Sequence, residues 1–502
     1  MNHSFARGAL VGAFLLALPT LAEDYSRYGL GWVYEDLATA PGWVQVQQVD
    51  VLPGRASCDT VVQVDLTPEM PPVGNQRSQG SCTAWAVGYY HKTHTEWLEH
   101  GWDVTDPANQ FSPAFIYNQI NGGVDRGSSF SDAMDLMIDQ GCGNLADNPY
   151  RYWDCTTWPS EEAFVRALPY RAAGRYTISL ADTAGVNAVR QRLANGFTST
   201  IGIAVYSNFD NIRNFNNTYC VADRYGANRG GHAVTIVGYC DTLTTNDGPG
   251  AFRVANSWGA GWGDEGYFWM SYVAVMDTGL SARSVAYATD RVDYQPRLLG
   301  RVRVAHGSRE KVGMRFVVGP RAMPLFRWDL RAWRWAGADV PFPDHDLVFD
   351  LTEAESLLVA AGADSLFFNC FDGLRDGIEG TIEHFSIEDW QGNYISRCWD
   401  LPMEIPEGSW VGAYALIPLP LGLEEVPGAT PAPARVPTVV RGVLNLDAGP
   451  GAAAVLLDAA GRKVMELAPG ANQLGRLSPG VYFCRVTGDG SEVSHRLVVL
   501  GR

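Results

Sequence analysis

The sequence predicts a multidomain protein in which an α+β domain is followed by two β-rich domains, and three observations carry this prediction. The chain has 502 residues, which is too long for one compact fold at about 100–200 residues per domain. It is 46% hydrophobic and 11% aromatic, so there is enough apolar surface for several cores. Its 54 Gly and 28 Pro indicate many turns and short strands.

The order of elements in residues 73–290 predicts the α+β domain. Helical patterns come first, at residues 82–100, 131–140 and 185–195. Apolar strand patterns follow at residues 200–206, 232–239, 252–256 and 266–270. Helices followed by strands are typical of two packed halves, and we expect a cleft between them.

The flanking segments have a different character. Residues 23–72 form an N-terminal extension with strand-like pieces at 43–51 and 60–66. Residues 299–422 show short strand runs at 312–318, 346–351, 366–370 and 410–417, which predict a β-sandwich. Residues 423–437 are rich in Pro, Ala and Gly and predict a linker. Residues 438–502 are again short strands and predict a small immunoglobulin-like β-sandwich.

The first 22 residues have the pattern of a signal peptide. Arg7 provides a positive head, residues 9–18 are apolar, and the small residues Thr20 and Ala22 precede a cleavage site after Ala22. This apolar run is too short to cross about 30 Å of hydrocarbon, and no later stretch reaches 18 uninterrupted apolar residues. We therefore expect a secreted or cell-surface protein with no transmembrane segment.

Export would place the nine cysteines in an oxidising compartment. Eight of them are enough for up to four disulfide bridges, and the sequence leaves their connectivity open. These eight are Cys58, Cys142, Cys155, Cys220, Cys240, Cys370, Cys398 and Cys484. Cys82 is then the odd one.

The charge argues against one class of partner. Lys plus Arg number 38 and Asp plus Glu 55, giving a net charge of −17. A surface of this sign repels phosphate backbones, so no nucleic-acid partner is expected.

Cys82 stands where a sulfur nucleophile would be activated. The turn-forming segment 76–81 precedes it and a helical pattern follows, so it begins a helix whose unsatisfied N–H groups favour the thiolate. His232 opens a strand pattern 232 − 82 = 150 residues downstream, after Gly231, and Asn256 follows in the block Asn256-Ser-Trp258-Gly. A Cys followed by His and Asn at this distance is the order expected for a thiol enzyme with a proton shuttle.

Over about residues 72–288 these three blocks resemble the papain family of cysteine peptidases. The resemblance implies that Cys82 is the nucleophile, His232 its ion-pair partner and general acid/base, and Asn256 the residue that orients the imidazole. It also implies a papain-like fold. Trp258 would shield the hydrogen bond between His232 and Asn256, and Gly231 would be a cleft residue. The resemblance further implies an oxyanion site. The side chain of Gln76, six positions before Cys82, and the Cys82 backbone N–H would form that site. Substrates would be proteins or peptides, with no cofactor and no metal.

The sequence departs from the family pattern at two positions beside the nucleophile. Gln79 stands where many relatives carry a disulfide cysteine, and its usual partner region, residues 121–127, also lacks Cys. Thr83 replaces the aromatic residue that commonly follows the nucleophile. The lead-in is also shorter than a typical inhibitory propeptide and shows no long helical pattern, so the sequence does not tell how activity is controlled.

Competing readings accompany these assignments. Cys82 could instead be an inert buried cysteine, and His232 could be a core histidine. The chain would then be an inactive adhesive or carbohydrate-binding protein on a papain-like scaffold. An acyl transferase would use the same thioester. Residues 372–377 half-match a calcium loop, but Leu374 stands at its third position, which favours a β-turn. A cluster of aromatic residues would fill a sandwich core or stack on sugar rings: Phe326, Trp328, Trp333 and Trp335.

The C-terminal segment shows a hairpin pattern at 455–464, a Leu-Ser-Pro-Gly-Val-Tyr-Phe block at 477–483 and a final strand at 497–500. These features resemble the sorting domains that carry bacterial cargo through the type IX secretion route. The resemblance implies the secretion machinery as a partner. The alternative is an immunoglobulin-like spacer.

Overall fold

The computed structural model describes residues 24–319, 326–329, 340–361, 364–417, 439–441, 443–446, 453–458, 463–468, 470–474, 477, 480–488 and 491–500. Its internal contacts divide the chain into two compact units, Met1–Leu421 and Gly422–Arg502. The expected signal peptide (1–22), the expected linker (423–437) and two members of the aromatic cluster, Trp333 and Trp335, lie outside the described residues.

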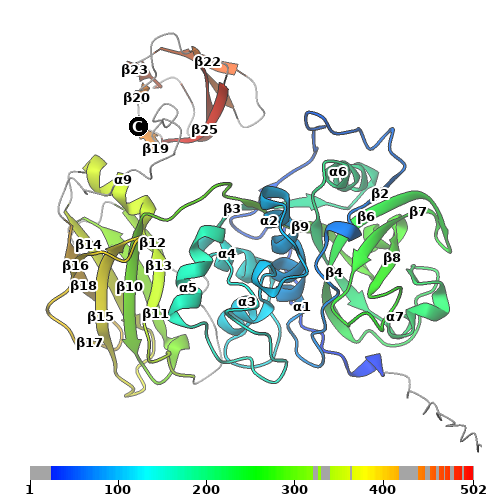
Figure 1. Ribbon diagram of the computed structural model, residues 1–502, viewed down its shortest axis with the longest axis horizontal. Helices are drawn as coiled ribbons and strands as arrows, with labels where there is room; N and C mark the ends of the chain where they lie inside the picture. The colour runs from blue at the N-terminus through cyan, green and yellow to red at the C-terminus, as the bar shows by residue number, and fades with distance from the viewer. Residues whose placement is uncertain are drawn as a thin grey trace, which may run out of the picture. The chain divides into compact units, whose positions relative to one another are not determined.

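One half of the first unit is helical (Figure 1). A single continuous helix runs from Cys82 to His100, as α1 (Cys82–Ala84), a π-helical stretch (Trp85–Lys92) and α2 (Thr93–His100), and ends at Gly101 with φ of 64°. Around it lie α3 (Pro113–Ile120), α4 (Phe130–Gln140) and α5 (Glu161–Ala167). The side chains of Ser112, Ser129 and Ser160 cap these three by accepting backbone N–H bonds. No helix in the described part of the chain is both long and apolar enough to cross a membrane.

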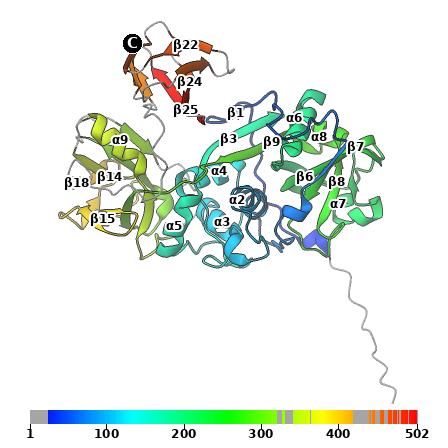
Figure 2. The same ribbon diagram turned by 45° about the horizontal axis from the view of Figure 1, so that its top comes forward.

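The other half is a nine-stranded sheet in the order β1-β3-β9-β4-β6-β7-β8-β5, with β2 paired to β6. Its strands are β1 (Val44–Gln45), β2 (Gln63–Asp65), β3 (Ala172–Ser179), β4 (Ser199–Val205), β5 (Thr218–Tyr219), β6 (Gly230–Thr245), β7 (Gly248–Ala255), β8 (Tyr267–Ser271) and β9 (Ser281–Asp290). The helices α6 (Thr183–Ala194) and α8 (Tyr272–Met276) lie against it (Figure 2), and α7 (Ser207–Asp210) follows β4. The predicted α+β domain is confirmed, and the extension joins its sheet through β1 and β2.

Two further sheets fill the described part of residues 298–417. One has the order β13-β10-β15-β16 with β17 paired to β15, and the other the order β12-β11-β14-β18. Phe316 of the second sheet contacts Phe349 and Phe385 of the first, with ring centroids 5.4 and 6.3 Å apart, so the two sheets share one core. The elements are β10 (Leu298–Ala305), β11 (Val312–Val318), β12 (Phe326–Asp329), β13 (Leu347–Asp350), α9 (Thr352–Ala361), β14 (Ser365–Asp372), β15 (Gly380–Asp389), β16 (Tyr394–Arg397), β17 (Met403–Ile405) and β18 (Trp410–Leu416).

Two ion pairs, of which only Arg171–Asp350 is buried, join these sheets to the helical half. Arg171, which follows α5, places Nη1 2.6 Å from Oδ2 of Asp350 at the end of β13. Arg301 on β10 pairs with Glu161 at the start of α5 and also with Glu388, at 2.6 Å. Charges removed from water in this way require their partners, so the interface is specific.

The second unit, described by itself, has a five-stranded sheet in the order β19-β25-β24-β21-β22 and the pair β20-β23. Its strands are β19 (Val439–Arg441), β20 (Val443–Leu446), β21 (Ala453–Asp458), β22 (Lys463–Leu467), β23 (Gly470–Gln473), β24 (Gly480–Gly488) and β25 (Ser491–Leu500). A small apolar core includes Leu444, Leu456 and Leu474. The expected hairpin at 455–464 corresponds to β21 and β22.

The cysteines differ from expectation, because all nine are free and the expected disulfide bridges are not formed. The sulfurs are distributed among separate cores. Cys58 lies in one apolar cluster, Cys142 and Cys370 in a second, and Cys484 in that of the C-terminal unit. Free cysteine packs as a small apolar side chain, so a count of cysteines cannot reveal pairing.

Candidate active site

The structure brings Cys82 of the helical half against the start of β6 in the sheet half. Cys82 begins α1 directly after Ser81, and its side chain is wholly buried. Its Sγ accepts a hydrogen bond from the backbone N–H of Ala233 at 3.4 Å. His232 is the residue before Ala233, so the candidate nucleophile and the candidate base meet where the two halves join.

His232 and Asn256 are paired on neighbouring strands. Nε2 of His232 lies 2.7 Å from Oδ1 of Asn256, and both side chains are wholly buried. The Trp258 ring lies beside this pair, with its centroid 5.1 Å from that of the imidazole. A buried indole excludes water from the hydrogen bond, which fits the predicted shielding position of Trp258.

The side-chain amide of Gln76 is held at three points. Its Oε1 accepts a bond from Oγ of Ser257 at 2.6 Å. Its Nε2 donates to the carbonyl oxygen of Gln79 at 2.8 Å and to that of Gly29 at 3.0 Å. Since a carboxamide has only two N–H groups, both are occupied, and one of them by a residue from the N-terminal extension.

Residues 28–33, which we call the strap, lie across this site. The N–H of Gly29 donates to Arg77 O at 2.9 Å, and the N–H of Trp32 donates to Gly231 O at 3.2 Å. The N–H of Ser128 donates to Gly31 O at 2.8 Å, and the N–H of Val33 donates to Ser128 O at 3.0 Å. The strap is therefore hydrogen-bonded both to Ser128 of the helical half and to Gly231 of the sheet half.

Two glycines permit this close approach. A Cβ atom on Gly31 would lie 1.8 Å from Gly80 O, and one on Gly29 would lie 2.3 Å from Gln79 O. Any side chain at either position would collide with the turn that precedes Cys82. The strap thus packs against the nucleophile turn through bare backbone.

Arg229 holds the first residue of the strap and the segment before it. Nη2 of Arg229 donates to Ser26 O at 2.5 Å and to Tyr28 O at 3.3 Å, while Nη1 pairs with Asp210. The ring of Tyr28 lies 5.6 Å from that of Trp258. Arg229 thus connects the strap to the sheet half.

Burial controls the protonation of the closed site. It raises the pKa of the Cys82 thiol, an effect opposed by the backbone N–H groups of Ala233, Gly31 and Thr83. Burial also lowers the pKa of His232 to about 4, although the bond to Asn256 acts in the other direction. Neutral thiol and neutral imidazole are therefore favoured while the strap is in place, in contrast to the thiolate that the helix start alone predicts.

The two departures from the family pattern have structural roles. Nε2 of Gln79 lies 3.4, 3.3 and 3.1 Å from the carbonyl oxygens of Arg151, Tyr152 and Asp154. It therefore ties the 151–154 loop to the nucleophile turn without a disulfide. The hydroxyl of Thr83 donates to Ser128 O at 2.9 Å. It therefore helps to fix the same carbonyl group that accepts the N–H of Val33 in the strap.

Sequence reasoning missed Ser257 and the strap. Ser257 lies inside the Asn256 block, and its position between two assigned residues is a local signal that could have found it. The strap has no such signal, because Gly29 and Gln76 are 47 residues apart and their contact follows from tertiary packing alone.

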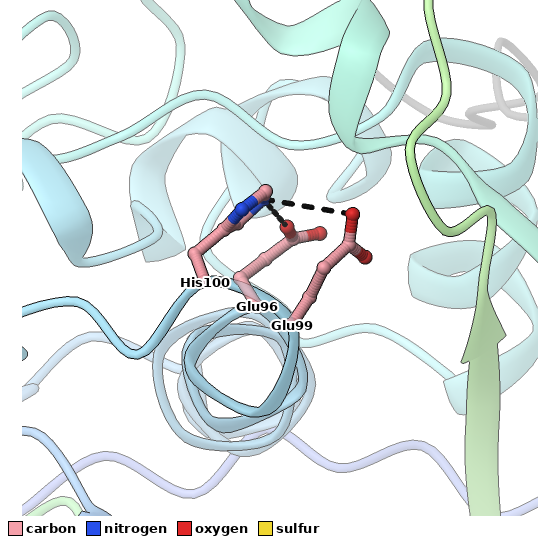
Figure 3. Close-up of side chains that lie close together, drawn as sticks. All are labelled: Glu96, Glu99 and His100. Atoms are coloured by element: carbon pink, nitrogen blue, oxygen red, sulfur yellow. Dashed lines mark ion pairs between the residues drawn. The ribbon is translucent and has the colours of Figure 1, made fainter. Parts of the chain in front are cut away.

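Two other groups of titratable side chains in the described residues already have partners within the protein. Glu96, Glu99 and His100 lie close together on α2, with His100 Nε2 3.4 Å from Glu96 and 3.8 Å from Glu99 (Figure 3). Glu96 is already paired with Lys92, and Glu99 accepts the N–H of Asp293 at 2.7 Å. In the 372–377 turn, the buried Asp372 carboxylate lies 3.2 Å from Nε2 of His306.

The structure thus brings the Cys82 sulfur, the paired side chains of His232 and Asn256 and the Gln76 amide together where the two halves join. Comparison with known proteins identifies the family of this part of the chain. Residues 62–288 match the family model described as papain family cysteine protease, and this segment is a papain-family cysteine peptidase domain.

Individual relatives are similar over limited lengths. An uncharacterized peptidase C1-like protein of Acanthamoeba polyphaga mimivirus is 27% identical over 219 residues, which cover 41% of this chain and 67% of that protein. Cysteine proteinase 2 of Entamoeba histolytica is 27% identical over 152 residues, covering 30% and 42%. A cathepsin B-like protein of Giardia intestinalis is 37% identical over 81 residues, covering 16% and 25%. The chain thus spans less than half of the last two proteins.

Solved structures are similar at a lower level. Xylellain, a cysteine protease from Xylella fastidiosa, aligns with a TM-score of 0.42 and 22% identity, covering 54% of this chain and 99% of that one. The bromelain protease of Ananas comosus aligns with a TM-score of 0.35 and 20% identity, covering 46% and 99%.

Proposed function

We propose that this protein is an exported cysteine endopeptidase in which Cys82 is the nucleophile and His232 the general acid and base. The observation that carries the proposal is the buried hydrogen bond of 2.7 Å between His232 Nε2 and Asn256 Oδ1. The Cys82 sulfur accepts a hydrogen bond from the backbone N–H of Ala233, the residue after His232. Such a bond fixes the ring so that its other nitrogen, Nδ1, is available for proton transfer.

The reaction follows from these positions. Sγ of Cys82 attacks the peptide carbonyl carbon as its proton passes to His232, and the oxyanion is stabilised by the Gln76 side chain and the Cys82 backbone N–H. The C–N bond breaks when His232 gives its proton to the leaving amine. Water then attacks the thioester with His232 as base, which releases the acid and restores the thiol.

The remaining assigned residues support this pair. Trp258 shields the bond between His232 and Asn256 from water, and Gly231 lies at the cleft wall, where its carbonyl oxygen is an acceptor for an extended chain. With the strap bound, Cys82 has no exposed surface, so the closed chain is expected to be latent.

A full-length Gly31→Val variant tests the proposal, because its side chain cannot fit against Gly80 O and should displace the strap. We expect this variant to cleave a mixed peptide library and to alkylate rapidly at Cys82 with iodoacetamide. A thiol-directed epoxide inhibitor should abolish both. The mass of each product distinguishes hydrolysis from acyl transfer to an amine.

Two further variants in the same background provide the controls. Cys82→Ser should abolish cleavage, whereas Cys240→Ser removes a half-buried sulfur elsewhere and should leave it unchanged. Slow Cys82 alkylation with no cleavage in the Gly31→Val chain would instead favour the inactive adhesive or carbohydrate-binding scaffold.

We further propose that the segment 438–502 is a sorting module for type IX secretion and that residues 1–22 direct export. Its separation as part of the compact unit Gly422–Arg502 supports the first assignment. Deleting residues 440–502 should leave the peptidase activity of the purified Gly31→Val chain unchanged but retain the protein in the periplasm of its native host. Wild-type levels at the cell surface or in the medium would support the immunoglobulin-like spacer instead.

A further inference from the structure

We propose that the side chains of Lys92 and Asp290 become joined by an isopeptide bond, with Glu96 as the group that moves the protons. The proposal is independent of the peptidase function, because it uses no residue of the candidate active site. Lys92 ends the π-helical stretch, Glu96 lies one turn later on α2, and Asp290 is the last residue of β9. The bond therefore joins the long helix to the sheet half, between residues 198 positions apart.

The three side chains meet inside the protein. Nζ of Lys92 lies 2.7 Å from Oδ1 of Asp290 and also pairs with Oε1 of Glu96. The side chains of Lys92, Asp290 and Glu96 are only 4%, 8% and 3% exposed. Nζ also lies over the ring of Phe111, 5.9 Å from its centroid. The amine nitrogen is thus held against a carboxyl group in surroundings that contain little water.

This placement favours a condensation that bulk water opposes. Well-oriented groups of one molecule react as if they were present at about 10⁵–10⁸ M. A dry interior also excludes the water that would reverse the step. The charged state is itself unfavourable, because an ammonium and a carboxylate each lose hydration when they are buried. A neutral amide removes both charges and is therefore better suited to the interior than the ion pair.

The two carboxyl groups differ in their protonation. Burial raises the pKa of Glu96 to about 7, an effect that Lys92 opposes and Asp290 reinforces. Burial also acts to raise the pKa of Asp290, but Lys92 and a hydrogen bond from Glu96 lower it overall. Glu96 is thus the carboxyl group that exchanges its proton near neutral pH, as a group that both accepts and donates protons must.

The reaction balances without any further reagent. Nζ passes one proton to the Asp290 carboxylate, and the neutral amine then attacks Cγ of the resulting carboxylic acid. Glu96 accepts the proton that Nζ loses and gives a proton to the departing hydroxyl group. The N–C bond forms, the C–O bond breaks, and one water molecule leaves with no change of oxidation state.

The reaction should be slow, because its first proton transfer is uphill. Burial acts to lower the pKa of Lys92, but Glu96 and Asp290 raise it overall, so the ammonium is favoured. The bond forms once in each molecule and no turnover is required. It would be a covalent connection in a part of the chain whose cysteines are all free.

Mass spectrometry of the unmodified full-length chain provides the first test. After the folded protein is denatured and digested with trypsin, we expect a branched peptide that contains both Lys92 and Asp290. Its mass should be that of the two separate peptides less one water molecule. Trypsin should also fail to cleave after Lys92, because an acylated lysine carries no charge. Recovery of the separate peptides at full mass, from protein kept folded for several days, would overturn the proposal.

Glu96→Gln tests the proton transfer, because it keeps the size of the side chain and removes the group that accepts a proton. The yield of branched peptide should fall at least about tenfold. The matched control is Glu99→Gln, which removes a carboxylate that lies 3.8 Å from His100 on the same helix. This control should leave the yield unchanged. Equal yields in the two variants would overturn the role of Glu96.

Cys82→Ser separates this bond from the proposed peptidase. The variant should form the branched peptide to the same extent, because Cys82 takes no part in the condensation. Loss of the bond in Cys82→Ser would overturn a reaction among these three side chains and would indicate thioester chemistry at Cys82 instead. A linked chain whose Gly31→Val form cleaves no peptide would uphold the bond and overturn the peptidase function.

Discussion

The carbonyl oxygen of Gly29 accepts a hydrogen bond of 3.0 Å from Nε2 of Gln76. The other N–H of this amide is bonded to Gln79 O, and its Oε1 is bonded to Ser257 Oγ. The amide is therefore held in one orientation, and only the bond to Gly29 is lost when the strap leaves. In the mechanism that we propose, displacement of the strap would free that N–H to donate to a substrate oxyanion without a change of side-chain conformation, as a preorganised donor requires.

The first prediction concerns Gln76. In the Gly31→Val background, Gln76→Ala should lower kcat by about 10²–10³ and change KM little, because an oxyanion donor acts mainly in the transition state. Steady-state kinetics with one peptide substrate measures this. Asn256→Ala should be milder, since it removes only the orientation of His232. Near wild-type turnover by Gln76→Ala would remove Gln76 from the site.

The second prediction concerns the Gln79 tether. Gln79→Ala should increase hydrogen exchange in the 151–154 loop and destabilise the fold by about 0.5–1.5 kcal/mol, because part-buried carbonyl oxygens lose their donor. Mass spectrometry measures the hydrogen exchange, and denaturant unfolding measures the loss of stability. The matched control is Gln140→Ala, a buried glutamine whose side-chain atoms have no hydrogen-bond partner in the described residues. Equal effects of the two substitutions would contradict the tether.

The third prediction concerns Arg229, which donates to Ser26 O and Tyr28 O. Arg229→Ala should loosen the strap, so Cys82 of the otherwise unmodified chain should alkylate faster with iodoacetamide. Arg224→Ala serves as the control, because Arg224 instead pairs with Asp277 at 3.5 Å and is partly exposed. Unchanged alkylation in both variants would show that Arg229 does not hold the strap.

The fourth prediction concerns pH. The pKa of His232 is lowered to about 4 in the closed form, mainly by burial, whereas an exposed imidazole has a pKa of about 6.5. For the imidazole alone, the open form binds more protons between these values, so the contribution of His232 to the closed form is fully present above pH 6.5 and is lost as the pH falls towards 4. Arg229 also disfavours the charged ring, while Asn256 stabilises it.

Hydrogen exchange of residues 28–33, corrected for intrinsic rates, should therefore increase between pH 6.5 and 4. In His232→Gln, which removes the imidazole but keeps the Asp210–Arg229 pair, the increase between pH 6.5 and 4 should be smaller than in the unmodified chain. A pH-independent strap in the unmodified chain would rule out His232 as the source of the effect.

The sequence by itself determined the order of elements and the composition of the site. The apolar periodicities at 82–100, 131–140 and 185–195 predicted helices because local hydrogen bonds and side-chain patterning decide such segments, and all three are helical in the structure. Cys82, His232 and Asn256 were proposed from local blocks and their order along the chain, whereas Gln76 and Trp258 were proposed through the resemblance to a known family. The fold brings all five together.

Only the tertiary structure decided the state of the site. Cys82 is wholly buried, and two glycines of the strap, far from it in the chain, pack against the turn that precedes it. The pairing of cysteines likewise depends on which cores they enter, and all nine remain free. Burial and long-range contacts have no signature in local sequence, because they arise when segments separated by tens of residues pack together and exclude water.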